Sequence, residues 1–95
     1  MMLRGIDVST HQGTIDWDEV AGAGLSFAIV KATQGRSEAT AGLRNFTDSK
    51  FKRNITEAHR IGLRVGVYHY LTAQTVGEAM EEAEYFLSVI EPYKP

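Results

Sequence analysis

The segment Gly5–Gly13 places polar side chains within and directly after a short apolar strand pattern. Ile6 and Val8 alternate with Asp7, as expected for a strand with two unlike faces. Strands disfavour aspartate, and an unsatisfied buried charge is costly, so a carboxylate here must be hydrogen-bonded, paired or functional. A structural bond to backbone at the strand end explains Asp7 as well as acid–base chemistry does. The rest of the chain has to decide between the two.

Polar side chains also end two further strand-like segments. Residues 26–32 form an almost continuous apolar run, typical of a strand buried on both faces, and residues 64–71 alternate like a third strand. The polar residues at the three ends are Asp7, Ser9, His11 and Gln12; Lys31, Thr33 and Gln34; and Tyr68, His69 and Tyr70. The carboxyl ends of parallel strands are where α/β folds bind ligands and do chemistry. Three polar ends out of three therefore favour a functional site over satisfied core residues.

Helix patterns separate and follow these strands. Asp16 caps a short helix, Asp48 or Ser49 caps a second helix that ends at Gly62, and Thr75 opens the longest. The order is therefore βαβαβα. Because crossovers in such units are right-handed, the sequence predicts an α/β fold of three parallel strands with outer helices.

Two other stretches carry expectations that the structure can test. Residues 35–50 show no clean period and are predicted to be one long loop. On the last helix one apolar stripe is predicted to face the core and the glutamates to face water. The stripe consists of Val76, Ala79, Met80, Ala83, Phe86, Leu87 and Ile90, and the glutamates are Glu78, Glu81, Glu82 and Glu84.

His69 shares a strand face with Val65 and Val67, so it is predicted to be a satisfied core histidine rather than a catalytic one.

Composition excludes several classes of function. Ninety-five residues, 43% hydrophobic and 23% charged, describe one small globular domain. The net charge of -2 leaves no electrostatic footprint for nucleic acid or an anionic membrane, and no apolar run approaches the roughly 20 residues of a membrane span. The chain has no cysteine, and His11 and His59 have no partners at metal-ligand spacing. No metal, cofactor, nucleic acid or membrane partner is expected.

Five short motifs follow one another at fitting spacing. They are Gly5-Ile6-Asp7-Val8-Ser9, His11-Gln12-Gly13, Asp16-Trp17, Lys31-Ala32-Thr33-Gln34-Gly35 and Gly66-Val67-Tyr68-His69-Tyr70. Together they resemble the N-terminal part of the family 25 glycoside hydrolases, the N-acetylmuramidase lysozymes of bacteria and phages. The resemblance extends from about Gly5 to Ile90, nearly the whole chain.

This resemblance implies a fold, a substrate and three site residues. The fold is an irregular, TIM-like (β/α) barrel, of which residues 1–95 would form the N-terminal half, as a single partial catalytic domain. The substrate is the peptidoglycan glycan strand, cleaved at the β-1,4 bond between N-acetylmuramic acid and N-acetylglucosamine. Asp7 matches an acidic cleft residue and is expected to be catalytic, whereas Gln34 and Tyr68 are expected to bind substrate. Gln34 stands where the family usually has glutamate, which removes one cleft carboxylate.

The resemblance also implies that a general acid is missing. The family's fourth strand supplies it in an Asp-x-Glu motif, and this sequence ends at Pro95, before that strand. Since glycoside hydrolysis needs two carboxylates, the 95-residue chain alone is expected to be inactive. The alternative is a non-catalytic peptidoglycan-binding remnant of the same family. A half-sized flavodoxin-like domain is a weaker hypothesis, because no glycine-rich phosphate loop follows any strand.

Partners and location follow from the same hypothesis. The unpaired edges of a three-stranded sheet predict self-association, or pairing with a missing C-terminal half. The expected place of action is the cell wall, outside the cell. The N-terminus enters the first strand at once, which leaves no room for a signal peptide. We therefore expect synthesis in the cytoplasm and release by another route, of the phage type or otherwise unconventional.

Overall fold

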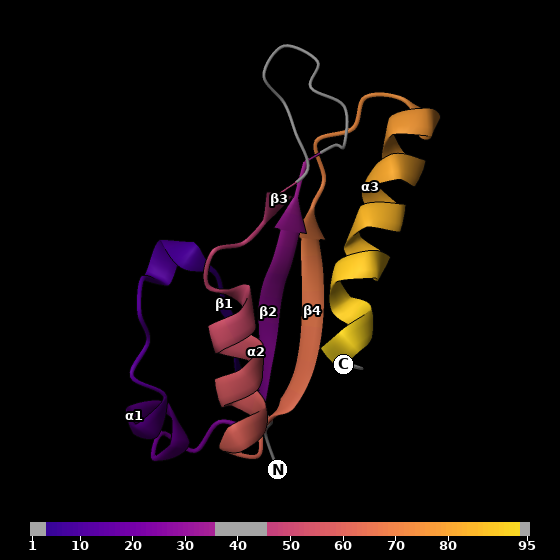
Figure 1. The fold of residues 1–95 in the computed structure, drawn as a ribbon. Coiled ribbons are helices and arrows are strands. Elements are labelled where there is room, and N and C mark those ends of the chain that lie inside the picture. The colour runs from indigo at the N-terminus through magenta and orange to yellow at the C-terminus, as the bar shows by residue number, and fades with distance from the viewer. Residues whose placement is uncertain (1–3, 36–45, 94–95) are drawn as a thin grey trace.

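The centre of the fold is a sheet whose three long strands run parallel. The structure is a computed structural model that describes residues 4–35 and 46–93. β1 (Gly5–Val8), β2 (Phe27–Gln34) and β4 (Arg64–Tyr70) are parallel, and β2 is hydrogen-bonded to both of the others (Figure 1). The predicted α/β fold with three parallel strands is therefore confirmed.

A fourth, very short strand extends this sheet. β3 (Phe46–Thr47) pairs antiparallel with Thr33 and Gln34, the last two residues of β2. The prediction of one continuous loop over residues 35–50 is wrong at this end, and residues 36–45 lie outside the described part of the chain. A two-residue strand leaves no alternation in the sequence by which it could be recognised. It forms here because β2 continues past Ala32 and offers an edge for pairing.

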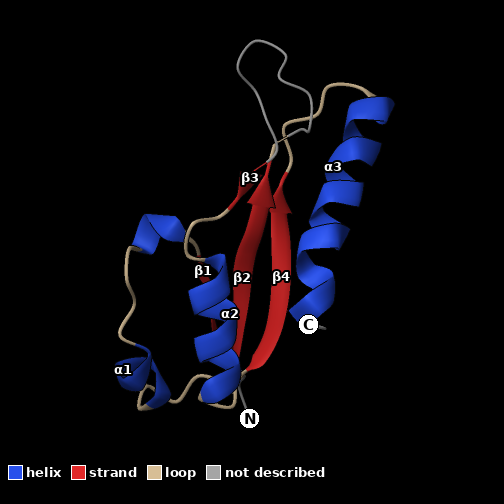
Figure 2. Cartoon of the chain, viewed as in Figure 1, coloured by secondary structure: helices blue, strands red, loops and turns tan. Residues whose placement is uncertain are grey.

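Helices connect and follow the strands (Figure 2). They are α1 (Trp17–Ala21), α2 (Phe51–Arg60) and α3 (Val76–Ile90), with short 3₁₀ turns η1 (Thr10–Gln12) and η2 (Glu91–Tyr93). Two predicted caps are confirmed: the Asp16 side chain accepts from backbone N–H groups of the first turn of α1, and Thr75 does so at α3.

The start of α2 differs from its prediction. The cap position is held by Lys50 rather than by Asp48 or Ser49, and it makes no side-chain capping bond. Asp48 lies two residues earlier, and its Oδ2 accepts from the backbone N–H of Lys50 at 3.1 Å. Asp48 thus shapes the turn that precedes the helix instead of capping the helix itself.

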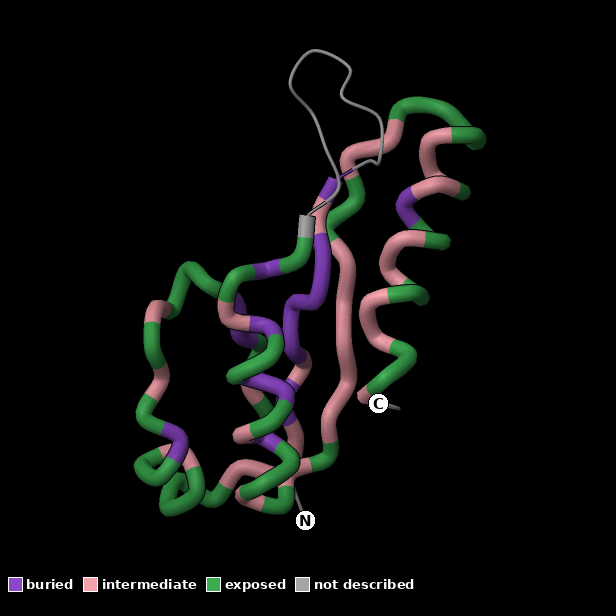
Figure 3. Tube along the Cα trace, viewed as in Figure 1, coloured by how far each residue is buried: buried purple, intermediate pink, exposed green. Residues whose placement is uncertain are grey.

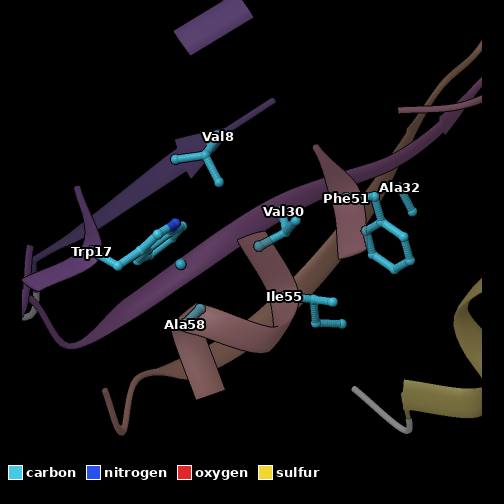
Figure 4. Close-up of a cluster of buried hydrophobic side chains, with 8 residues drawn as sticks. Val8, Trp17, Val30, Ala32, Phe51, Ile55 and Ala58 are labelled. Carbon is cyan, nitrogen blue, oxygen red and sulfur yellow. The ribbon is translucent and has the colours of Figure 1, made fainter. Parts of the chain in front are cut away.

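The helices pack on one face of the sheet and enclose the core there. Trp17 of α1 and Phe51 and Ile55 of α2 gather around Val30 of β2 (Figure 4). Figure 3 shows burial concentrated along β2 and on part of α2. The buried hydrophobic cluster consists of Val8, Trp17, Ala28, Val30, Ala32, Phe51, Ile55 and Ala58. At about 1.5–3 kcal/mol for each large apolar side chain buried, this cluster is the main source of stability.

Helix α3 is rotated relative to its predicted orientation. Val76, Met80 and Leu87 of the predicted stripe are exposed, at 78%, 60% and 60%. The side that faces the sheet carries Phe86, Val89 and Ile90 together with Glu82, which is 0% exposed. The prediction that Glu82 faces water is therefore wrong. Two overlapping apolar stripes can be drawn on this helix. The stripe that is buried in the structure is the one beside Glu82, whose side chain makes a polar contact with β4.

The opposite face of the sheet carries the residues that alternate with the core positions. Residues aligned in neighbouring parallel strands point to the same side, and Asp7 aligns with Ile29, Ile29 with Gly66, and Lys31 with Tyr68. We call this side the open face; it comprises Gly5, Asp7, Phe27, Ile29, Lys31, Gly66 and Tyr68. No helix among the described residues packs over it (Figure 1).

Candidate functional site

Asp7 lies on the open face near the carboxyl end of β1. Its neighbours Ile6 and Val8 turn toward the helices and anchor the strand in or against the core. The Asp7 side chain is exposed, so folding imposes no burial cost on its charge. The strand thereby presents a solvated carboxylate at the edge where α/β folds place their chemistry.

Tyr68 comes from β4 and lies close enough to Asp7 to feel its charge. Burial raises the pKa of the Tyr68 phenol, and the negative charges of Asp7 and Asp48 raise it further, while a hydrogen bond with Ser9 acts in the opposite direction. The phenol therefore keeps its proton at neutral pH and remains a hydrogen-bond donor. The structure thus brings together Asp7 and Tyr68, two of the three predicted site residues.

Asp48 is a second carboxylate near Tyr68, and both of its oxygens are occupied. Oδ1 accepts from the backbone N–H of Thr10 at 3.1 Å, and Oδ2 accepts from that of Lys50. The side chain is 2% exposed. Asp48 therefore holds the turn after β1 against the start of α2. The sequence pattern suggested only a helix cap, because the contact with Thr10 spans 38 residues.

Gln34, the third predicted site residue, is hydrogen-bonded to Lys31. Lys31 Nζ donates to Gln34 Oε1 at 2.5 Å and lies 5.6 Å from the centre of the Tyr70 ring. Lys31 also aligns with Tyr68 across the two strands. The three predicted residues therefore share one end of the sheet, and Lys31, which is only 4% exposed, contacts Gln34 there. Lys31 interrupts an apolar strand as Asp7 does, and it is among the polar strand-end residues that the sequence indicates.

His69 lies on the helix side of β4 within a chain of hydrogen bonds. Its Nδ1 lies 2.8 Å from Thr33 Oγ1, and its Nε2 lies 2.6 Å from Glu82 Oε1. The prediction that His69 is satisfied by hydrogen bonds is confirmed, and its structural rather than catalytic role stays a prediction. Its partner Glu82 was missed, although a histidine on an apolar strand face signals that a polar partner must be buried nearby.

Two of the hollows on the described part of the chain lie away from the predicted site residues. One hollow, of about 430 Å³, lies between the start of α2 and the end of α3, and another, of about 540 Å³, lies along α2. Neither is lined by Asp7, Gln34 or Tyr68. Within residues 4–35 and 46–93 no three histidine, aspartate or glutamate side chains come together as metal ligands. In the same residues no helix has the length and apolarity to cross a bilayer.

Known lysozymes are similar to this chain in sequence and in structure. Lysozyme M1 of Streptomyces globisporus is 38% identical over 86 residues, which cover 90% of this chain and 26% of that protein. The autolytic lysozyme of Clostridium acetobutylicum is 34% identical over 88 residues, covering 93% of this chain and 24% of that protein. The bacterial lysozyme from Streptomyces coelicolor superposes with a TM-score of 0.74 at 38% identity, over 93% of this chain and 36% of that one.

These coverages agree with a partial fold. The chain spans about a quarter of the length of the two sequence relatives and about a third of the solved lysozyme. The solved relatives have TIM-like (β/α) barrels, of which the parallel strands described above are the first part. The family model described as "Glycosyl hydrolases family 25" matches residues 6–94, nearly the entire chain. The chain therefore belongs to glycosyl hydrolase family 25.

Proposed function

We propose that residues 1–95 are one partial catalytic domain of a peptidoglycan hydrolase, the N-terminal half of a lysozyme barrel. The reaction is hydrolysis of the β-1,4 bond between N-acetylmuramic acid and N-acetylglucosamine, at the cell wall. The observation that carries this proposal is the placement of Asp7 beside Tyr68 on the open face, at the carboxyl ends of β1 and β4. Membership of a glycoside hydrolase family supports the class of reaction.

In this proposal Asp7 is the carboxylate that faces the positive charge developing on the sugar ring as the glycosidic bond breaks. A retaining or inverting glycosidase needs one carboxylate as nucleophile, base or stabiliser and a second one as acid. Asp7 is exposed and suits the first role. Tyr68 keeps its proton and can donate to Asp7 or to a sugar oxygen, and the amide of Gln34 offers a donor and an acceptor to sugar hydroxyls.

The second carboxylate is not available at this site among the described residues. Asp48 is the other acid near Tyr68, and its two oxygens already accept backbone N–H groups. The glutamates of α3 belong to the helix side of the sheet, where Glu82 contacts His69. We propose that residues outside these 95 supply the general acid, and that the chain alone does not cleave peptidoglycan.

A lysis assay tests this proposal. Muramic-acid-containing cell walls are followed by turbidity with the pure chain, and then with the chain plus the remaining part of Lysozyme M1, produced separately. We expect no lysis by the chain alone and measurable lysis by the mixture. In the mixture Asp7→Asn lowers turnover by about 10²-fold or more, while Asp18→Asn, at an exposed site on α1, changes nothing. Clear lysis by the pure chain contradicts the missing acid.

The second candidate is a binding remnant of the same family, favoured by the single available carboxylate. It predicts that the chain binds a muramic-acid tetrasaccharide and that no mixture ever lyses walls. If a mixture does lyse walls, the remnant hypothesis fails, and a rise in the Michaelis constant at unchanged turnover for Asp7→Asn would then make Asp7 a binding residue of an active enzyme.

The open face also supports self-association, or pairing with a missing C-terminal half. β1 and β4 are the outer strands of the parallel sheet, and Phe27 and Ile29 on the open face are only half-buried. Unpaired strand edges beside apolar side chains are templates for another chain. Light scattering tests this directly, and a monodisperse monomer that melts cooperatively contradicts it.

A further inference from the structure

Glu82 of α3 is a fully buried carboxylate that links the ends of two strands. The backbone N–H of Thr72 donates to Glu82 Oε1 at 3.1 Å, so this oxygen is an acceptor. His69 Nε2 lies within hydrogen-bond distance of the same oxygen, at 2.6 Å. His69 Nδ1, 2.8 Å from Thr33 Oγ1, continues the chain to β2. A single carboxylate thus joins α3, the loop before it, β4 and β2.

The linked residues are direct neighbours of the candidate site. Thr33 precedes Gln34 in β2, and His69 lies between Tyr68 and Tyr70 in β4. Side chains alternate along a strand, so holding His69 on the helix side directs Tyr68 to the open face. The register between β2 and β4 shifts between Lys31 and Thr33, at the point where the network begins. The network therefore fixes the part of the sheet whose geometry determines the site.

Stability alone does not explain a carboxylate at this position. Glu82 is 0% exposed, and its Oε2 has no hydrogen-bond partner among the described residues. Replacing a buried ionic contact by apolar residues of similar volume is often neutral or stabilising, whereas buried polar contacts can specify one arrangement of the chain. Phe86, whose ring centre lies 6.0 Å from that of His69, shows that apolar packing is available at the same place.

We propose that Glu82, acting through His69, is a positioning residue that sets the carboxyl ends of β2 and β4, so that Gln34 and Tyr68 face a bound glycan strand. The glycan in this statement rests on the proposed function, but the placement of the two strand ends does not. Glu82 touches no substrate and takes no part in the chemistry.

The test compares an apolar and a conservative substitution. Glu82→Met keeps the approximate volume and removes the acceptor, whereas Glu82→Gln keeps an oxygen for Thr72 and His69. Glu84→Met, on the exposed side of the same helix, is the matched control. The first readout needs no ligand: the ring NMR signals of Tyr68 and Tyr70. We expect them to move in Glu82→Met and to stay in place in Glu82→Gln and Glu84→Met.

The second readout is the affinity for a tetrasaccharide of alternating N-acetylglucosamine and N-acetylmuramic acid. We expect a loss on the order of tenfold in Glu82→Met, because displaced contact groups lose binding steeply with distance, and recovery in Glu82→Gln. Unchanged tyrosine signals in a folded Glu82→Met protein overturn the positioning role. If the unaltered chain fails to bind the sugar while the tyrosine signals still respond to Glu82→Met, glycan binding by this half of the site fails and the positioning role stands.

A second variant applies if Glu82→Met does not fold. Thr33→Val removes the hydroxyl beside His69 Nδ1 and keeps the shape of the side chain. We expect the Tyr68 ring signal to move in this variant too. A folded Thr33→Val protein with an unmoved Tyr68 signal overturns the inference.

Discussion

Lys31 donates a hydrogen bond to Gln34, although a regular strand would place these two residues on opposite faces. The register shift between Lys31 and Thr33 accounts for the contact, because one extra residue in β2 returns Gln34 to the side of Lys31. The same irregularity turns Thr33 toward His69. One local departure from strand geometry therefore shapes both sides of the sheet at the candidate site.

We predict that Gln34→Glu stabilises the chain. A carboxylate accepts the Lys31 hydrogen bond more strongly than an amide does, and the gain is about 1 kcal/mol in the free energy of unfolding. For a chain of this size that is a rise in Tm of about 4–8 °C, measured by thermal denaturation. Gln74→Glu, at an exposed position before α3, is the control and changes Tm little. A lower Tm for Gln34→Glu would show that the neutral amide of Gln34 is the more favourable hydrogen-bond acceptor for Lys31.

Gly5→Ala is predicted to destabilise the sheet. A Cβ at Gly5 would lie 2.0 Å from Cε2 of Phe27, whose ring covers this glycine, so the ring must move. Overpacking of this kind costs about 1–3 kcal/mol. Gly77→Ala is the matched control, because nothing lies within 4 Å of its added Cβ and α3 gains about 0.5–1 kcal/mol from alanine. Chemical denaturation of both variants measures the difference, and equal effects would contradict the Phe27–Gly5 contact.

The raised pKa of Tyr68 predicts a loss of stability at alkaline pH. The folded state holds the phenol proton more tightly than the unfolded chain, whose phenol has the ordinary pKa of 10.0. The contribution of Tyr68 is therefore constant below pH 10.0 and is lost as pH rises from there through the pKa of the folded state. Denaturation between pH 8 and 12 measures it, and Tyr68→Phe removes it.

Asp7→Asn tests the electrostatic link between the two site residues. Removing the negative charge lowers the pKa of Tyr68 toward its ordinary value, and burial, the largest cause, keeps part of the shift. NMR titration of the tyrosine ring follows the change. Asp18→Asn, a charge removal at an exposed residue of α1, should leave the Tyr68 titration as it is. Identical titration curves for Asp7→Asn and the unaltered chain would show that the charge of Asp7 does not affect the Tyr68 phenol.

The orientation of α3 predicts unequal effects on stability for substitutions at two adjacent residues. Phe86 packs against the core and near His69, so Phe86→Ala costs about 2 kcal/mol. Leu87 is 60% exposed, so Leu87→Ala stays within about 0.5 kcal/mol of the unaltered chain. Urea denaturation compares the two, and similar losses for Phe86→Ala and Leu87→Ala would indicate that the predicted stripe, which contains both residues, faces the core.

The sequence alone predicts the order of the three long strands and the three helices, and it predicts a candidate site at the carboxyl ends of those strands. Apolar runs and caps are local signals: the continuous run of β2 and the capping residues Asp16 and Thr75 act within a few residues of themselves. The same kind of signal, a polar side chain at the end of an apolar strand, makes Asp7 and Tyr68 candidate site residues, and the roles expected of them come from the family resemblance. Parallel pairing then brings such strand ends together whatever the details of packing.

Only the tertiary structure decided which face of α3 is buried and which acids are available at the site. The sequence of α3 is compatible with two buried faces, one that contains Glu82 and one that contains Leu87. Which face is buried depends on the contact between Glu82 and His69, 13 residues apart in the chain. The sequence suggests Asp48 as a helix cap, but in the structure its side chain accepts a hydrogen bond from Thr10, 38 residues away in the chain. A buried polar group is satisfied by whatever partner the fold brings near, and that partner leaves no periodic trace in the sequence.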